Sequence, residues 1–297
     1  MQPTEILILD DCSTDNSLEV IQDFARRHPQ IRVHRNERNL GAVGNINQAF
    51  NLARGEYVFV PSADDEVVPG FFEKSLALLA QHPQAALSCT IAEWHDVDSG
   101  LKWHMGSGMA ESPCYLSPDE LVRLGRKGKL IICTSSVILK KEALRQAGGY
   151  IPELRWHVDW FATAVMAFRN GLCYVPEPLS NFYLHSSSYY HKGRATGEHV
   201  QVLIRLMDKL RTPAYADVAP RVRDSAMLSL FGLTIVRLMI RHPEYRWFLT
   251  PRLLLRASRR SGELLGKQIL PRPLARLCLR LLYHHKETSS PGAEHNA

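Results

Sequence analysis

The sequence Glu5-Ile-Leu-Ile-Leu-Asp10-Asp11 is a continuous apolar run that ends in two carboxylates. An uninterrupted aliphatic run of this length predicts a strand that is buried on both faces, as in a parallel sheet. The residues after it are mostly Ser, Thr, Asp and Asn, which predicts a turn and the capped start of a helix. Ligands of open parallel sheets bind at the carboxyl ends of the strands, so this acidic pair lies where a binding site is expected.

A second acidic pair follows a strand of the same kind. Tyr57-Val-Phe-Val60 is apolar and runs into Asp64 and Asp65, and a helix is predicted after Pro69. Between the two strands we expect a strand over residues 31–36, a glycine-containing loop over 39–44 and a helix over 45–53. Strand and helix therefore alternate with short links, which predicts an α/β fold with a mostly parallel sheet and helices on both faces.

The second half of the chain changes to helical spacing. From about Glu198, Leu, Ile and Met recur at intervals typical of helices, and basic residues far outnumber acidic ones between Arg241 and Lys286. The last residues are polar with Pro and Gly, which is typical of a disordered tail. The expected organisation is an α/β domain over residues 1–190, a helical basic region over 191–286 and a disordered tail over 287–297.

The composition limits the partners and the cellular compartment expected for the protein. The 297 residues are 45% hydrophobic and carry a formal net charge of +6, which either is a solvated surplus or attracts a phosphate-rich substrate or an anionic membrane. The six cysteines are scattered without a C-x-x-C pair, so a zinc site is improbable and a reducing compartment is the simplest inference. We see no secretory leader and no apolar stretch of about 20 residues that would span a bilayer. These features predict a cytoplasmic protein.

The first acidic pair and the loop after it have two explanations each. Carboxylates at a strand end can accept hydrogen bonds from a nucleobase or a ribose, but Asp10 and Asp11 are explained equally well as a turn rich in capping residues. In Asn39-Leu-Gly41, glycine permits close backbone approach to a ligand, and the helix N-terminus beyond favours a diphosphate. The spacing matches neither a dinucleotide fingerprint nor a P-loop, so a plain loop is the better explanation of this motif alone.

The second acidic pair suggests a metal ion. Adjacent carboxylates at the end of a buried strand repel one another unless a cation lies between them, and hard oxygen ligands suit Mg²⁺ or Mn²⁺. The alternative is an acidic turn before the helix at Pro69, and the strand context favours the metal. His185 follows another predicted strand and could ligate the metal or contact a diphosphate, although a single His in this position is more often structural.

A further carboxylate, Asp159, lies at the start of a predicted helix over residues 156–169. With Trp156 and Trp160 as an apolar wall, Asp159 could act as a general base. For this motif alone the better explanation is that Asp159 caps the helix and that both Trp side chains lie in the core.

Taken together and in this order, the motifs resemble the family 2 glycosyltransferases, which have the GT-A fold. The resemblance covers about residues 4–190, and the joint occurrence of the motifs is specific although each alone is not. The matching strings are Ile-Leu-Asp10-Asp11-Cys-Ser-Thr-Asp-Asn-Ser, Asn39-Leu-Gly41 with Asn47-Gln-Ala and Gly55-Glu-Tyr, Ala63-Asp64-Asp65, and Gly148-Gly149-Tyr150 with His157-Val-Asp159-Trp160.

The resemblance implies a role for each matching residue. The donor-binding residues would be Asp10, Asp11, Asn39, Gly41, Asn47 and Asp64, with Asp11 on the nucleobase, Asp10 supporting it and Asp64 on the ribose or sugar. Asp65 would ligate the Mg²⁺ or Mn²⁺ that neutralises the diphosphate leaving group. Asp159 would be the catalytic base that deprotonates an acceptor hydroxyl for in-line attack, which inverts the anomeric configuration.

The implied function is an inverting, metal-dependent hexosyltransferase. It would move a sugar from a UDP-, GDP- or dTDP-linked donor to a saccharide or lipid-linked acceptor in the assembly of a cell-envelope polysaccharide or glycolipid. One alternative is an inactive or fragmentary protein that binds nucleotide-sugars. A nucleotidyltransferase would need a Gly-rich loop with Arg or Lys after its first strand, and none is visible. The basic helices lack interleaved aromatics, so a nucleic-acid partner is not expected.

Two features depart from the family pattern. The family normally opens with a strand, a turn and a helix before the strand that begins here at Glu5, so a gapped sheet, an incomplete donor site and a natural start upstream of Met1 are expected. Val158 stands where the family often has Glu before the base, which bears on fine tuning of the base and on acceptor preference.

The basic C-terminal helices raise the possibility of a membrane partner. Basic side chains there would meet anionic lipid at the inner face of the cell membrane while Leu253–Leu255 and Leu264–Leu265 enter the interface. The basic residues concerned are Arg252, Arg256, Arg259, Arg260, Lys267, Arg272, Arg276 and Arg280. A helical cap with a solvated basic face explains the same pattern equally well.

Overall fold

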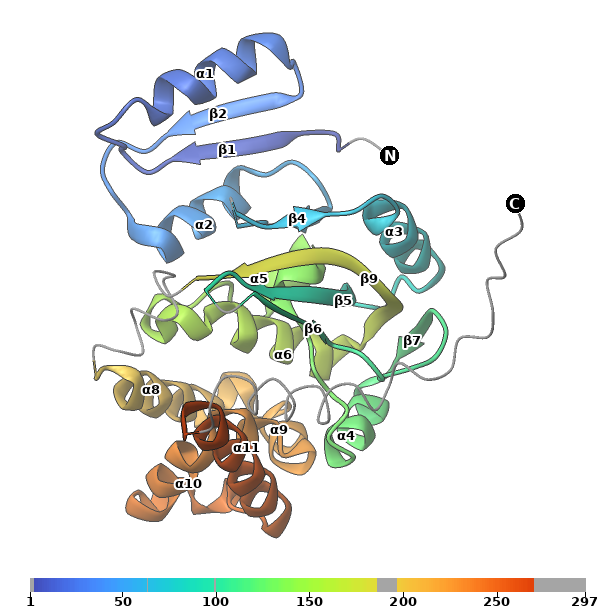
Figure 1. Cartoon of the computed structure of the whole chain (residues 1–297), viewed down its shortest axis with the longest axis vertical. Helices are drawn as coiled ribbons and strands as arrows, with labels where there is room; N and C mark the ends of the chain where they lie inside the picture. Colours follow the sequence, from blue (N-terminus) through green and yellow to red (C-terminus); the bar gives the residue numbers. More distant parts are fainter. Residues whose placement is uncertain (1–2, 63, 99, 186–196, 270–297) are drawn as a thin grey trace.

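The strands form two separate sheets in the computed structural model, which describes residues 3–62, 64–98, 100–185 and 197–269 (Figure 1). The smaller sheet pairs β1 (Ile6–Asp10) with β2 (Ile31–Arg35) in parallel. The larger sheet has the order β3-β8-β5-β9-β4, with β6 on β5 and β7 on β9. Its strands are β3 (Tyr57–Phe59), β4 (Glu66–Val67), β5 (Leu87–Asp96), β6 (Leu101–Met105), β7 (Cys114–Leu116), β8 (Val137–Lys140) and β9 (Leu172–Leu184).

The larger sheet is mixed, so the prediction of a mostly parallel sheet is wrong. Only β5 and β9 run parallel in it, whereas β3, β4, β6, β7 and β8 all pair antiparallel with their neighbours. A short aliphatic run such as Val137–Leu139 reports burial on both faces, and burial does not specify strand direction. The direction of β8 follows from the way it enters between β3 and β5, which its own sequence does not encode.

The two sheets are joined through a helix and not through a ladder. Among the described strands, β1 is paired on its β2 side alone and β3 on its β8 side alone, a division that agrees with the expected gap in the sheet. Helix α2 (Gly41–Leu52) packs against β1 and against the 3₁₀ segment η2 (Pro152–His157) (Figure 1). Its side chains Val43 and Phe50 are buried in the main core, so α2 ties the N-terminal sheet to the rest.

In the α/β part, the N-terminal helix has few buried side chains and the central helix has many. Helix α1 (Ser17–Arg27) has none buried, whereas most of α6 (Val158–Asn170) is buried beside the larger sheet. The other helices of this part are α3 (Phe71–Gln81), α4 (Pro118–Arg126) and α5 (Lys141–Gln146). The tight packing around α6 places the rigid centre of the molecule next to the predicted base, Asp159.

The C-terminal helices share the core of the α/β part. One cluster of buried side chains runs from α2 through α6 to Leu206, Ile235 and Leu253. The helical elements here are α8 (His199–Arg211), η3 (Pro213–Tyr215), α9 (Ala219–Ser225), η4 (Met227–Phe231), α10 (Gly232–Arg241), η5 (Pro243–Phe248) and α11 (Pro251–Ile269). This helical cap is therefore packed on the α/β part, against α4, α6 and η2. The expected domain boundary at residue 190 and the expected tail over 287–297 lie outside the described residues.

Two residues predicted to face a membrane point inward. Leu253 is fully buried, and the Arg256 guanidinium donates hydrogen bonds to the backbone carbonyls of Gly125 and Ser225. Their assignment to a lipid-facing surface is therefore wrong, because the inner side of α11 packs on the cap. Within the ranges that the structure describes, no helix has the length and hydropathy needed to cross a membrane.

Candidate active site

Asp10 closes the turn that follows β1. Its side chain is 2% exposed, and its carboxylate accepts the backbone N–H of Ser13 at 3.2 and 3.3 Å. Arg35 approaches the same carboxylate at 3.4 Å. Cys12, which precedes Ser13 in the turn, has φ of +66°. Asp10 therefore shapes the loop that presents Asp11, and its role in donor binding stays a prediction.

Asp11 connects the ends of both strands of the small sheet. Its Oδ1 accepts hydrogen bonds from the Asn36 side-chain amide and from the Leu40 backbone N–H, both at 2.8 Å. Asn36 also donates to Asn45 Oδ1 at 2.8 Å. None of the described residues bonds to Oδ2 of this partly buried carboxylate, so that oxygen is available to a ligand. The sequence analysis missed Asn36 and Asn45, although Asn36 lies at the carboxyl end of β2, where the rule for strand ends would have found it.

The expected loop over 39–44 is shorter than predicted, because α2 begins at Gly41, and the predicted donor-binding residues around it have two different roles. Asn39 accepts the backbone N–H of Gly41 at 2.9 Å, and Gly41 has φ of +71°, a conformation that favours glycine. This pair forms the entry to α2. Asn47, by contrast, donates to the Tyr150 carbonyl at 2.6 Å and accepts the Tyr150 N–H at 3.2 Å. Asn47 therefore holds the Gly149–Tyr150 loop in place, and its predicted contact with a donor stays a prediction.

Asp65 has one buried carboxylate oxygen without a hydrogen-bond partner among the described residues. Its Oδ1 accepts the Tyr183 backbone N–H at 3.2 Å, whereas no described residue donates to its Oδ2. Burial, together with repulsion from Asp64, raises the pKa of the Asp65 carboxyl to about 6. A divalent cation would relieve both effects, so the donor set fits a hard metal ion at this oxygen.

His185 reaches the same place from the end of β9. Its Nε2 lies 3.2 Å from Asp64 Oδ2, so His185, a predicted metal ligand, contacts the predicted donor-binding residue that precedes Asp65. In the part of the chain that the structure describes, no group of three or more His, Cys, Asp or Glu side chains is arranged to hold a metal by itself. The two carboxylates would therefore need further oxygens, as a bound diphosphate provides, to complete the coordination of Mg²⁺ or Mn²⁺.

Asp159 lies in the first turn of α6 with both oxygens held. Thr134 donates to Oδ2 at 2.7 Å and the Trp160 backbone N–H donates to Oδ1 at 2.6 Å. Burial raises the pKa of the Asp159 carboxyl above its ordinary value, and these two hydrogen bonds oppose the rise. A carboxylate with a raised pKa is a stronger proton acceptor, as a general base requires. Thr134 is a second residue that the sequence analysis missed, because nothing in its local pattern connects it to Asp159.

One short segment links the metal region to the base. Cys133 precedes Thr134 in the turn before β8 and accepts a hydrogen bond from Trp94 Nε1 at 3.2 Å. Burial raises the pKa of the Cys133 thiol, and hydrogen bonds with Ser135 and Trp94 oppose the rise. Trp94 pairs in register with Phe182, and the N–H of the next residue, Tyr183, donates to Asp65. Through these contacts the turn at Cys133–Thr134 connects the surroundings of Asp65, the predicted metal ligand, with Asp159, the predicted base that Thr134 holds.

Val158 does not face this constellation. Its side chain is buried in the hydrophobic core, while Asp159 next to it is only partly buried. A Glu in this orientation would be buried among apolar residues, so Val fits the packing of α6 in this chain.

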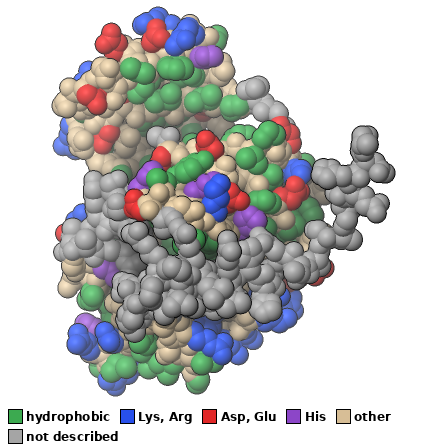
Figure 2. Space-filling model, in the orientation of Figure 1, with side chains coloured by type: hydrophobic (Ala, Val, Ile, Leu, Met, Phe, Trp, Pro, Cys, Tyr) green, Lys and Arg blue, Asp and Glu red, His purple; other side chains and the backbone are tan. Residues whose placement is uncertain are grey.

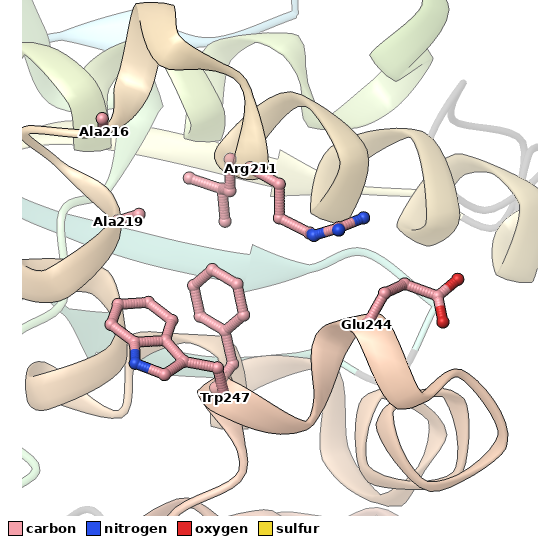
Figure 3. Close-up of a pocket in the computed structure, with 7 residues that line it drawn as sticks. Arg211, Ala216, Ala219, Glu244 and Trp247 are labelled. Atoms are coloured by element: carbon pink, nitrogen blue, oxygen red, sulfur yellow. The ribbon is translucent and has the colours of Figure 1, made fainter.

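A cavity of about 310 Å³ lies away from the strand ends, among the C-terminal helices (Figure 3). Apolar side chains form most of its wall, and Arg211 and Glu244 are its charged groups. The lining residues are Leu210, Arg211, Ala216, Ala219, Glu244, Trp247 and Phe248. None of the predicted site residues lines this cavity, so it is separate from the candidate active site.

Comparisons with known proteins relate the chain to glycosyltransferases. Residues 1–148 match the family model for Glycosyl transferase family 2. The chain is 26% identical over 227 residues to the uncharacterized glycosyltransferase YibD of Escherichia coli K12, across 72% of this chain and 64% of that protein. It is also 26% identical over 196 residues to the uncharacterized protein Rv1520 of Mycobacterium tuberculosis H37Rv, across 64% of this chain and 52% of that protein. The chain thus spans between about half and just under two thirds of these relatives.

Solved structures share the fold. Staphylococcus aureus TarS 1–349 in complex with UDP-GlcNAc superposes with a TM-score of 0.58 at 14% identity, over 96% of this chain and 84% of that one. The same protein in complex with UDP gives 0.52 at 17% identity, over 76% and 62%. At this identity the likeness shows the fold alone, and it agrees with the α/β architecture described above.

Proposed function

Because the chain belongs to glycosyl transferase family 2 through residues 1–148, we propose that it transfers a sugar from a nucleotide-diphosphate donor to an acceptor hydroxyl with inversion. The observation that supports this most is the turn at Cys133–Thr134. Thr134 in this turn orients Asp159 as a base, and Cys133 is linked through Trp94 and the β5–β9 pair to Tyr183, whose N–H donates to Asp65. A metal ligand and a general base joined by such contacts are what transfer from a diphosphate donor needs.

The donor would lie across the ends of β1, β2 and β3. Oδ2 of Asp11, which has no partner among the described residues, would accept a hydrogen bond from the nucleobase or the ribose. Asp64 would contact the ribose or sugar. When Mg²⁺ or Mn²⁺ is bound, it supplies charge neutralisation for the departing diphosphate, with Asp65 as its ligand and His185 as a second candidate. UDP and UDP-GlcNAc are bound in the TarS structures, which favours a UDP-linked donor here over GDP- or dTDP-linked ones.

The acceptor would be activated by Asp159. Its carboxylate takes the proton of the acceptor hydroxyl, the oxygen attacks the anomeric carbon, and the bond to the diphosphate breaks on the opposite side. Thr134 and the Trp160 N–H keep the carboxylate from rotating during this step. The acceptor would be a saccharide or a lipid-linked sugar in the assembly of an envelope polysaccharide or glycolipid, with the enzyme at the inner face of the membrane.

The second candidate is a nucleotide-sugar binder without transfer activity. It is favoured by the edges of β1 and β3, each of which lacks a ladder partner on one side within the described chain. Such a protein would retain Asp11 and its hydrogen bonds but would not position the sugar against Asp159.

A donor screen separates these candidates. The full chain is incubated with UDP-, GDP- and dTDP-sugars, Mn²⁺ and a mixture of saccharide acceptors, and the free nucleoside diphosphate is measured. Release with one donor class, lost in Asp159→Asn, is expected. Calorimetric binding of UDP without release would favour the binder. If no donor is bound and no nucleoside diphosphate is released, both candidate functions are overturned.

A further inference from the structure

Two neighbouring helices of the cap expose aliphatic side chains to solvent. Ile240, near the end of α10, is 53% exposed, and Leu255, in the second turn of α11, is 55% exposed. Single exposed aliphatics are ordinary, but these two occur in the same surroundings. Both are flanked by arginines, which suggests that they belong to one surface.

Each of these aliphatic residues lies beside two arginines on the outer side of its helix. Ile240 is accompanied by Arg237 and Arg241, which are four residues apart and therefore stack along one face. Leu255 has Arg252 three residues before it and Arg259 four residues after it, which are its nearest neighbours on the helix surface. All four arginines are exposed.

The two helices run antiparallel and pack on the same core. The Leu233 backbone N–H donates to Ser261 Oγ at 2.8 Å, so the start of α10 meets the far part of α11. The end of α10, with Ile240, therefore lies level with the first turns of α11. Val236 and Leu253 on the inner sides are buried in the common core, which turns the arginine-bearing sides outward.

The charge on this side of the cap is strongly positive. Residues 237–263 contain seven arginines and two acidic residues, Glu244, which lies 3.4 Å from His242 Nδ1, and Glu263. Arg256 is bonded inward, but Arg237, Arg241, Arg252 and Arg259 make no ion pair or hydrogen bond with the side chains that the structure describes, which end at residue 262. Figure 2 shows Lys and Arg side chains among hydrophobic ones at the end of the molecule that carries α10 and α11.

Guanidinium groups around a protruding aliphatic side chain match an anionic bilayer. The arginines meet lipid phosphates while the aliphatic side chain enters the boundary between headgroups and acyl chains. An acidic protein would neutralise the arginines, but it would need a matching apolar pocket for each of two separate side chains. A fluid bilayer accepts both at once, so lipid is the partner that fits this surface better.

We propose that Arg237, Ile240, Arg241, Arg252, Leu255 and Arg259 form a surface that docks on an anionic phospholipid bilayer. This docking surface differs from the one expected from the sequence, because it includes α10 and excludes Leu253 and Arg256. Docking would bring the active site to a lipid-linked acceptor, and this use of the surface rests on the proposed function. Whether the surface binds a bilayer is tested independently of sugar transfer.

The test is co-sedimentation of the full chain with phosphatidylcholine vesicles that contain or lack phosphatidylglycerol. Binding to the anionic vesicles, weakened by added salt, is expected. Arg252→Glu with Arg259→Glu should weaken it by at least about 25-fold, from about fivefold for each arginine removed. Ile240→Asp with Leu255→Asp should weaken it at unchanged arginine content.

Matched control variants lie on α1 at the opposite end of the chain. Arg26→Glu with Arg27→Glu changes the net charge equally, and Val20 and Phe24, both 47% exposed, serve as control positions for Asp. The proposal is overturned if wild type ignores anionic vesicles, or if the α1 variants lose binding as strongly as those on α10 and α11. Donor turnover with a soluble acceptor is measured alongside. Turnover without vesicle binding refutes docking alone, and vesicle binding without turnover refutes the proposed function alone.

Discussion

The Thr134 hydroxyl donates a 2.7 Å hydrogen bond to Oδ2 of Asp159, across 25 positions of the sequence. The other oxygen, Oδ1, accepts the N–H of Trp160 in the first turn of α6. The carboxylate is therefore held from the turn before β8 and from its own helix. Both contacts stabilise the ionised form in surroundings that disfavour charge, which keeps a base with a raised pKa usable near neutral pH.

Replacing this base should abolish transfer while the fold survives. Asp159→Asn keeps the size of the side chain and the bond from Thr134 but cannot take a proton, so kcat should fall by about 10²–10⁴-fold. Binding of UDP with Mn²⁺, measured by calorimetry, should not change, because Asp159 lies on the acceptor side. Wild-type turnover in this variant would remove Asp159 from the role of base.

Thr134→Val should change the pH dependence of the reaction. Without its hydrogen bond the pKa of Asp159 rises further, so the base is protonated up to a higher pH. The acidic limb of the profile of kcat/KM against pH should move to higher pH. Thr134→Ser retains the hydroxyl and should restore the wild-type limb. A uniform loss of activity at every pH, without a shift, would show that Thr134 is only structural.

Asp65→Asn should raise the melting temperature in the absence of metal. The folded-state pKa of about 6 exceeds the ordinary value of 3.8, so the fold binds the neutral form better and the ionised form destabilises it above pH 6. The stabilisation by Asn should be full at pH 8, shrink as the pH falls through 6 and vanish near 4. Differential scanning calorimetry in EDTA measures it. A constant difference across this range would contradict the assigned pKa.

Added metal should reverse the order of the melting temperatures of wild type and Asp65→Asn. Mn²⁺ binds the wild-type carboxylate and therefore raises its melting temperature by mass action, while Asp65→Asn should respond little. An equal shift of both proteins would move the metal to other ligands.

Asn47→Ala should destabilise the protein. It removes two hydrogen bonds to the backbone of Tyr150 and leaves a partly buried N–H and carbonyl unpaired, for a loss of about 1–3 kcal/mol. Asn51→Ala, at an exposed position of the same helix, is the control and should change stability by less than about 0.5 kcal/mol. Urea denaturation compares the two, and equal midpoints would show that the bridge to Tyr150 contributes nothing.

Arg155→Gly should stabilise the segment before the base. Arg155 has φ of +50° and ψ of −119°, a conformation that strains a side chain by about 1–3 kcal/mol and that glycine adopts freely. Arg155→Ala loses the same 3.6 Å approach to Glu198 but keeps the strain. The Gly variant should therefore melt at a higher temperature than the Ala variant. The reverse order would show that the backbone here is relaxed.

Strand ends were predictable from local chemistry, and distant partners were not. The run Glu5–Asp10 predicted β1 within a residue because aliphatic periodicity is a property of the segment itself. The helix at Asp159 was found for the same reason, two residues early. Thr134 was missed, since its meeting with Asp159 depends on how β8 enters the sheet. Asn47 has no local sign of its bond to Tyr150, 103 positions away.

The sequence by itself determined the order of strands, helices and acidic motifs, because periodicity, capping and carboxylates at strand ends are written in adjacent residues. Only the tertiary structure decided the mixed direction of the large sheet, the hydrogen bond that joins Thr134 to Asp159, and which arginines of the cap face outward. These depend on packing between segments that are far apart in the chain. An apolar run predicts a strand, but how deeply it is buried, the direction of its neighbours and the side of a helix that remains exposed are set when the whole core closes: Ile6–Leu9 of β1, expected to be buried on both faces, are only partly buried or exposed.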